Sequence, residues 1–109
     1  MTGEVVESIQ AHIRLARAVL GDDADYIAGT SLLREAELAA GEVPVDLVAD
    51  ALTFQAVLDL RNELGCCLLA AEQLQEAGVE HRVVVDILQR GAATAEGILG
   101  RLVMTLERC

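Results

Sequence analysis

Residues 57–74 read VLDLRNELGCCLLAAEQL, and residues 84–102 read VVDILQRGAATAEGILGRL. In both stretches apolar residues return at steps of three and four, which places them on one face of an α-helix. The repeating positions are Val57, Leu60, Leu64, Cys67, Ala71 and Leu74 in the first stretch, and Val84, Leu88, Gly91, Ala95, Ile98 and Leu102 in the second. Two continuous apolar seams of this kind predict two long helices that pack side by side.

Glycine and proline around these seams set the expected helix ends. Pro44 fits the first turn of a helix, where its missing N–H costs nothing, and the next strong breaker along the chain is Gly78. One long helix is therefore expected over 45–77, with a weak point at Gly65 where a kink is credible. The last helix is expected from residue 79 or 80 to residue 108.

The N-terminal part of the chain shows the same helical spacing in two shorter segments, 4–20 and 24–40. Thr2 is a plausible N-cap, and Gly21 and Gly41 are expected to end the two helices. Short connections make neighbouring helices antiparallel. We therefore predict one all-α domain over residues 1–109, similar to a four-helix bundle, with two shorter N-terminal helices and two long antiparallel C-terminal helices.

The chain carries more apolar side chains than a small domain usually contains. Hydrophobic residues make up 53% of it and the mean hydropathy is +0.41, yet it has one Phe, one Tyr and no Trp. Surplus apolar helix surface is typically covered by a second copy or another partner. We expect a homo-oligomer, most simply a homodimer. Its interface is expected to contain Leu64, Cys67, Leu68, Leu74, Leu88, Gly91, Ala95, Ile98 and Leu102.

Charge narrows the classes of partner. With 18 acidic residues against 8 basic ones the net charge is −10, which opposes binding to nucleic-acid phosphate and to anionic lipid. A basic protein partner, neutralised as an inhibitor neutralises its target, is the alternative that this charge favours. All the basic residues are arginine, which is typical of GC-rich bacterial or halophilic genomes. No segment has the length of a membrane span, so a cytoplasmic location is expected.

Residues 91–100 contain three glycines and three alanines inside one predicted helix. Glycine in a helix interior is destabilising, and close helix–helix approach is the compensation that we favour. The rival interpretation is a small-molecule or catalytic pocket beside this stretch, with Tyr26, Arg61 or Asn62 supplying the polar groups. Arg61 and Asn62 belong to a polar interruption of the long apolar seam, and a solvent-exposed turn explains it equally.

The reactive residue types form no recognisable catalytic or metal-binding pattern. Cys66 and Cys67 are adjacent, which differs from the Cys-x-x-Cys spacing of redox and zinc sites. Neither His12 nor His81 has a carboxylate three residues before it, as metal sites in helical bundles require, so no metal or cofactor is expected. His12 permits phosphotransfer only if it is exposed, and the residues after it lack the Lys-Gly pair of such modules. The leading interpretation is a non-catalytic helical interaction protein.

Overall fold

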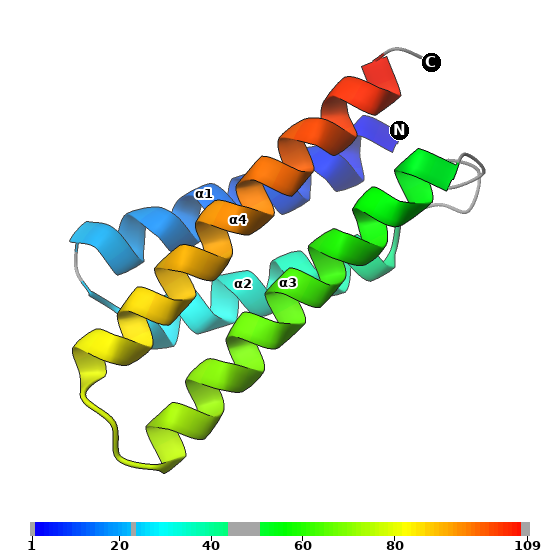
Figure 1. Ribbon diagram of the computed structural model, residues 1–109. Coiled ribbons are helices and arrows are strands. Elements are labelled where there is room, and N and C mark those ends of the chain that lie inside the picture. Colours follow the sequence, from blue (N-terminus) through cyan, green and yellow to red (C-terminus); the bar gives the residue numbers. More distant parts are fainter. Residues whose placement is uncertain (1, 23, 44–50, 108–109) are drawn as a thin grey trace.

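The computed structural model describes residues 2–22, 24–43 and 51–107, and every element within them is an α-helix. The elements are α1 (Thr2–Asp22), α2 (Tyr26–Gly41), α3 (Ala51–Glu76) and α4 (His81–Glu107). The predicted all-α class is confirmed, and the helices pack as a bundle (Figure 1). The expected helix start at Pro44 and the expected end at residue 108 lie outside the described residues.

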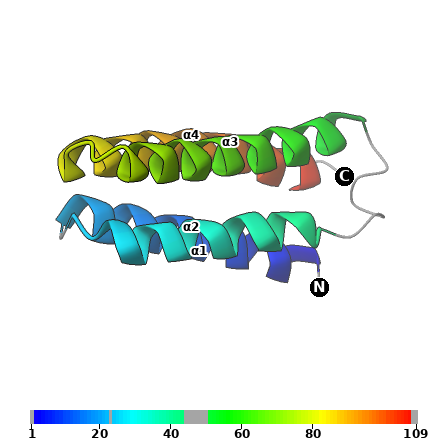
Figure 2. The same ribbon diagram turned by 90° about the horizontal axis from the view of Figure 1, so that it is seen from below.

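The four helices form two layers, one of α1 and α2 and one of α3 and α4 (Figure 2). Between the layers α1 packs on α4, and α2 packs on α3 and more lightly on α4. The molecule measures 45 × 23 × 18 Å along its principal axes. The turns α1–α2 and α3–α4 lie at one end of the bundle, and α1 begins near the other end, where α4 finishes (Figure 1).

One helix end differs from the expected one, at Gly21. Gly21 lies inside α1, which continues to Asp22, and the left-handed residue of the following turn is Ala24, with φ 50°. Asp25 caps α2, because its carboxylate accepts a hydrogen bond from the Ala28 N–H at 3.0 Å. A side-chain cap of this kind satisfies one of the free N–H groups in the first helical turn. Gly78, with φ +77°, follows the end of α3 as expected.

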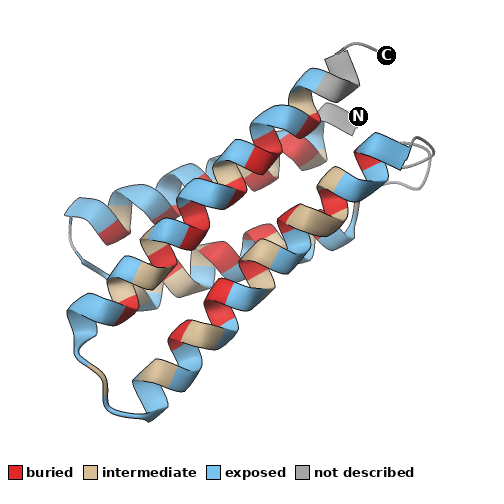
Figure 3. Cartoon of the chain, in the orientation of Figure 1, coloured by how far each residue is buried: buried red, intermediate tan, exposed pale blue. Residues whose placement is uncertain are grey.

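The core lies between the two layers and is made of aliphatic side chains from all four helices (Figure 3). Ile9, Ile13, Leu33, Leu60 and Leu88 are fully buried. The helix α3 is continuous through Gly65, where a break was credible from the sequence. An added Cβ at Gly65 would lie 2.8 Å from the carboxylate Oε2 of Glu37 in α2. The glycine therefore leaves room for a side chain of the neighbouring helix.

In α2 the structure corrects the expected choice of core residues. The sequence places four large apolar residues at helical spacing in this segment: Ile27, Leu32, Leu33 and Leu38. Of these, Ile27 and Leu38 are 69% and 63% exposed. The buried positions of α2 are instead Gly29, Leu33, Ala36 and Ala40. Small side chains let α2 approach its neighbours closely: a Cβ added at Gly29 would lie 2.6 Å from two atoms of the Leu20 side chain. Ile27 and Leu38 therefore point away from the core, whereas Leu33 points into it.

Candidate functional site

The residues expected at a subunit interface lie in the core of the single chain. Eight of the nine are buried and Leu74 is half-buried. They form the contact between α3 and α4, together with contacts of α4 to the other layer. The eight are Leu64, Cys67, Leu68, Leu88, Gly91, Ala95, Ile98 and Leu102. Since these side chains are covered by the chain itself, any surface offered to a second copy must consist of other residues.

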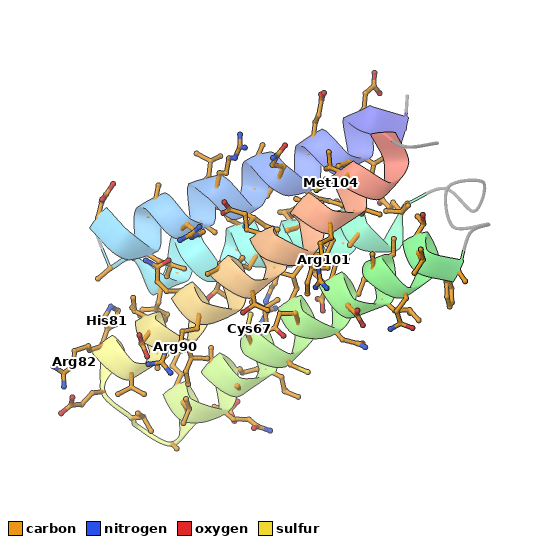
Figure 4. The ribbon with its side chains drawn as sticks, turned by 45° about the horizontal axis from the view of Figure 1, so that its top comes forward. Cys67, His81, Arg82, Arg90, Arg101 and Met104 are labelled. Atoms are coloured by element: carbon orange, nitrogen blue, oxygen red, sulfur yellow. The ribbon has the colours of Figure 1, made fainter. Side chains whose placement is uncertain are left out.

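The three residues expected to serve a pocket are separated in the structure. Arg61 and Asn62 line an open groove of about 640 Å³ between α2 and α3. Tyr26 lines a smaller hollow of about 140 Å³ at the end of the bundle where the two turns lie. Neither lining includes a residue between 91 and 100. Gly91 is instead packed against Cys67, whose side chain reaches from α3 towards α4 (Figure 4).

The groove between α2 and α3 carries one positive and one negative side chain, each beside a glycine of the opposite helix. Glu37 of α2 lies over Gly65 of α3, and the Arg61 guanidinium of α3 lies 3.8 Å from an added Cβ at Gly41 of α2. Within the described part of the chain, neither Glu37 nor Arg61 takes part in an ion pair. The groove therefore presents two opposite charges that do not neutralise each other directly.

Apolar side chains surround this charged pair. Leu38 and the half-buried Leu58 line the groove together with the exposed Cys66 thiol. Leu69, which is 56% exposed, lies eleven residues beyond Leu58 and so on the same face of α3. Phe54, 49% exposed, lies one turn before Leu58. We call this surface the α2–α3 face: Glu37, Leu38, Gly41, Phe54, Leu58, Arg61, Asn62, Gly65, Cys66 and Leu69.

The other large exposed apolar residues do not line this groove, although Ile27 lies eleven residues before Leu38 and so on the same face of α2. Met104 lies on the outer side of α4 near its C-terminal end (Figure 4). The remaining large exposed side chains are Leu15, Ile27, Leu52 and Val83. Isolated apolar residues are normal on a protein surface. The α2–α3 face differs because its apolar side chains flank a groove.

A polar cluster joins the two turns at the other end of the bundle. The His81 ring contacts Tyr26 edge to face, with centroids 4.6 Å apart, and its Nε2 is 2.7 Å from the Ala24 carbonyl oxygen. The Gln75 amide donates a hydrogen bond to the Tyr26 hydroxyl at 2.7 Å. Each of these contacts ties α2 or the turn before it to the α3–α4 hairpin. The cluster therefore has a structural explanation that needs no ligand.

The histidines and acids give no sign of a metal centre in the described residues. No group of three His, Cys, Asp or Glu side chains there is placed to hold an ion. His12 is half-buried, and its Nδ1 lies 2.6 Å from the carbonyl oxygen of Ser8 one turn earlier in α1. This contact holds the ring against its own helix. No helix in the described ranges combines the length and the hydrophobicity that a membrane crossing would require.

The two adjacent cysteines are expected to differ strongly in reactivity. Burial, assisted by the negative charge of Glu63, raises the pKa of the Cys67 thiol to about 12. Its Sγ also donates a hydrogen bond to the Leu64 carbonyl oxygen at 3.3 Å. The thiolate is the nucleophile, so a pKa about three units above the usual 9.0 leaves roughly a thousandfold less thiolate at pH 8. Cys66 is exposed.

Alkylation at pH 8 tests this difference in a Cys109→Ser background, which keeps only the two helical thiols. At protein concentrations low enough to keep the chain monomeric, one equivalent of reagent is expected to react quickly at Cys66, and the second only after denaturant is added. The Cys66→Ser/Cys109→Ser variant isolates Cys67 and should resist alkylation in the native state. Fast reaction of that variant would contradict the burial of Cys67.

The sequence indicated the groove residues of α3 but not those of α2. Arg61 and Asn62 were recognisable because they interrupt an apolar seam. Glu37 and Leu38 of α2 were not recognised as site residues, because a Glu beside a Leu on a helix is typical of an ordinary boundary between polar and apolar faces. Comparisons with protein-family models, with curated proteins and with solved structures found no significant match.

Proposed function

We propose that this chain is a non-catalytic interaction protein that acts by burying apolar helix surface against a second copy of itself. The observation that carries the proposal is the α2–α3 face, where Leu38 and Leu58 line an open groove and the exposed Leu69 lies on the same face of α3. Exposed apolar side chains that gather around a groove are typical of a contact site. A cytoplasmic location agrees with such a role and belongs to the proposal.

We keep in the proposal the division into two shorter N-terminal helices and two long antiparallel C-terminal helices. The surface that contacts the second copy is different from the one that the sequence suggested. The sequence suggested that the long pair would offer its apolar seam to a second copy. Leu64 and Leu88, at the centre of that seam, have no exposed surface. The proposed contact therefore uses one helix from each pair, α2 and α3.

Sedimentation velocity at micromolar concentrations tests the assembly. A dimer would show twice the 11.6 kDa mass of one chain, and the mass should fall towards that of one chain on dilution. A species that stays at 11.6 kDa up to hundreds of micromolar would reject the homodimer.

A second candidate function is the binding of a small polar molecule in the groove. It is favoured by the volume of about 640 Å³ and by Arg61, Asn62 and Glu37 in the lining. Ligand pockets bury most of their ligand, whereas this groove is open along its length. A monomeric chain in the sedimentation experiment would leave the groove free for such a ligand, and a dimer would cover it.

A further inference from the structure

We propose that two copies of this chain dock through the α2–α3 face about a two-fold axis that pairs Glu37 of each copy with Arg61 of the other. This inference rests on the proposed homodimer and names its surface and its register. In a two-fold interface the same patch is used by both subunits, so the patch must be complementary to itself. A groove whose positive and negative side chains form no ion pair within residues 2–22, 24–43 and 51–107 fulfils that requirement.

The positions of the two charges fix the axis. In α3, Arg61 and Gly65 lie two residues on either side of position 63; in α2, Glu37 and Gly41 lie two residues on either side of position 39. Since Glu37 lies over Gly65 and Arg61 lies beside Gly41, the two charges are about one helical turn apart along the groove. Consider a two-fold axis that crosses both helices at the point midway between the two charges. This axis places Glu37 of one copy opposite Arg61 of the other, and Arg61 opposite Glu37.

The same axis also matches the apolar side chains. Leu58 and Leu69 lie five and six residues on either side of position 63, so Leu58 of one copy faces Leu69 of the other. Leu38 lies one residue from the axis and faces its own equivalent. These three leucines remain exposed or half-buried in the single chain. One axis thus accounts for both the charged and the apolar features of the face.

The balance of charges on this face is compatible with contact between two acidic chains. Two chains of charge −10 repel each other, so association is least opposed where charges balance. Beside the groove Arg34 and Glu72 form an ion pair at 3.9 Å that bridges α2 and α3. Together with Glu37 and Arg61, the groove and this adjacent pair carry two positive and two negative side chains. A basic partner would instead be drawn to a surface with an excess of acids.

Charge reversal gives a test that only this arrangement passes. Glu37→Arg alone and Arg61→Glu alone each create two like-charge contacts in a symmetric dimer, so the dissociation constant of each is expected to rise by about tenfold or more. An equimolar mixture of the two variants restores both attractive contacts and should form a heterodimer. The double variant E37R/R61E restores them within a homodimer. Sedimentation of each sample, with the wild type beside it, provides the readout.

The matched control is the pair Asp86 and Arg90 on the exposed side of α4, which forms an ion pair at 3.1 Å. Asp86→Arg and Arg90→Glu are expected to leave the dissociation constant unchanged, alone and mixed. Circular dichroism checks that every variant is helical; where a reversal unfolds the chain, Glu37→Gln and Arg61→Gln replace it and should each weaken the dimer.

The outcomes separate this inference from the proposed function. A wild-type dimer that is indifferent to all Glu37 and Arg61 variants would overturn the α2–α3 contact and leave homodimerisation standing. A monomeric wild type would overturn both. Weakened single variants without recovery in the mixture or the double variant would overturn the direct pairing of Glu37 with Arg61.

Discussion

The Leu88→Ala variant is expected to lose about 2–5 kcal/mol of its free energy of unfolding, because truncation of a fully buried leucine removes apolar contacts and leaves a cavity. Leu88 has no exposed surface and lies in the core. From the sequence the same residue was a candidate for a subunit interface. An interface residue would change the dissociation constant of a dimer, whereas a core residue changes the stability of the single chain.

Leu38→Ala is the matched control, since it removes the same atoms from a side chain that is 63% exposed. It is expected to change the stability of the single chain by no more than about 0.5 kcal/mol and to weaken the dimer instead. Urea denaturation at low protein concentration separates the two effects, because dimerisation makes apparent stability depend on concentration. If Leu88→Ala left the unfolding midpoint unchanged and abolished the dimer, Leu88 would belong to the interface after all.

The sequence predicted the buried faces of α3 and α4 well because most of their heptad-like positions hold large aliphatic side chains. Helical periodicity is then sufficient to identify the buried face. In α2 the same reasoning selected Leu33, which is buried, but also Ile27 and Leu38, which are exposed. There the buried face consists largely of Gly29, Ala36 and Ala40, and small residues give a weak hydrophobic signal although they permit the closest packing.

The sequence indicated the groove residues of α3 but could not show which residues of α2 lie beside them, and the reason is different. Arg61 and Glu37 are 24 positions apart in the sequence, and their neighbourhood depends on how α2 is aligned against α3. Periodicity identifies the faces of one helix and says nothing about the alignment of two. Tyr26 was grouped with Arg61 for the same reason, yet Tyr26 begins α2 whereas Arg61 lies beside Gly41 at the end of that helix.

The contact between Gly91 and Cys67 is the point at which α4 and α3 approach most tightly among the described glycines. A Cβ added at Gly91 would lie 2.4 Å from the Cys67 Cβ and 2.6 Å from its Sγ, both far inside van der Waals contact. Cys67 lies on a helix and is buried, so it cannot swing away as a surface side chain would. An alanine at position 91 can therefore be accommodated only if α3 and α4 move apart.

Gly91→Ala is accordingly expected to lower the free energy of unfolding by about 1–3 kcal/mol, the usual cost of overpacking a core, despite a gain of about 1 kcal/mol in helix propensity. Gly97→Ala is its control on the same helix: an added Cβ meets nothing within 4 Å there, so that variant should gain about 0.5–1 kcal/mol. Denaturant unfolding of both variants gives opposite signs for the same chemical change.

The double variant Gly91→Ala/Cys67→Gly then tests whether Cys67 is the cause. It removes the Cβ and Sγ that the new methyl group would strike and places the missing volume on the opposite helix. The double variant is expected to regain part of the free energy of unfolding that Gly91→Ala loses. The new glycine inside α3 reduces this gain by about 1 kcal/mol. If Gly91→Ala were as stable as Gly97→Ala, α3 and α4 would lie further apart than described. Close packing within the chain would then explain none of the three glycines of residues 91–100, since an added Cβ at Gly97 or Gly100 already meets nothing within 4 Å.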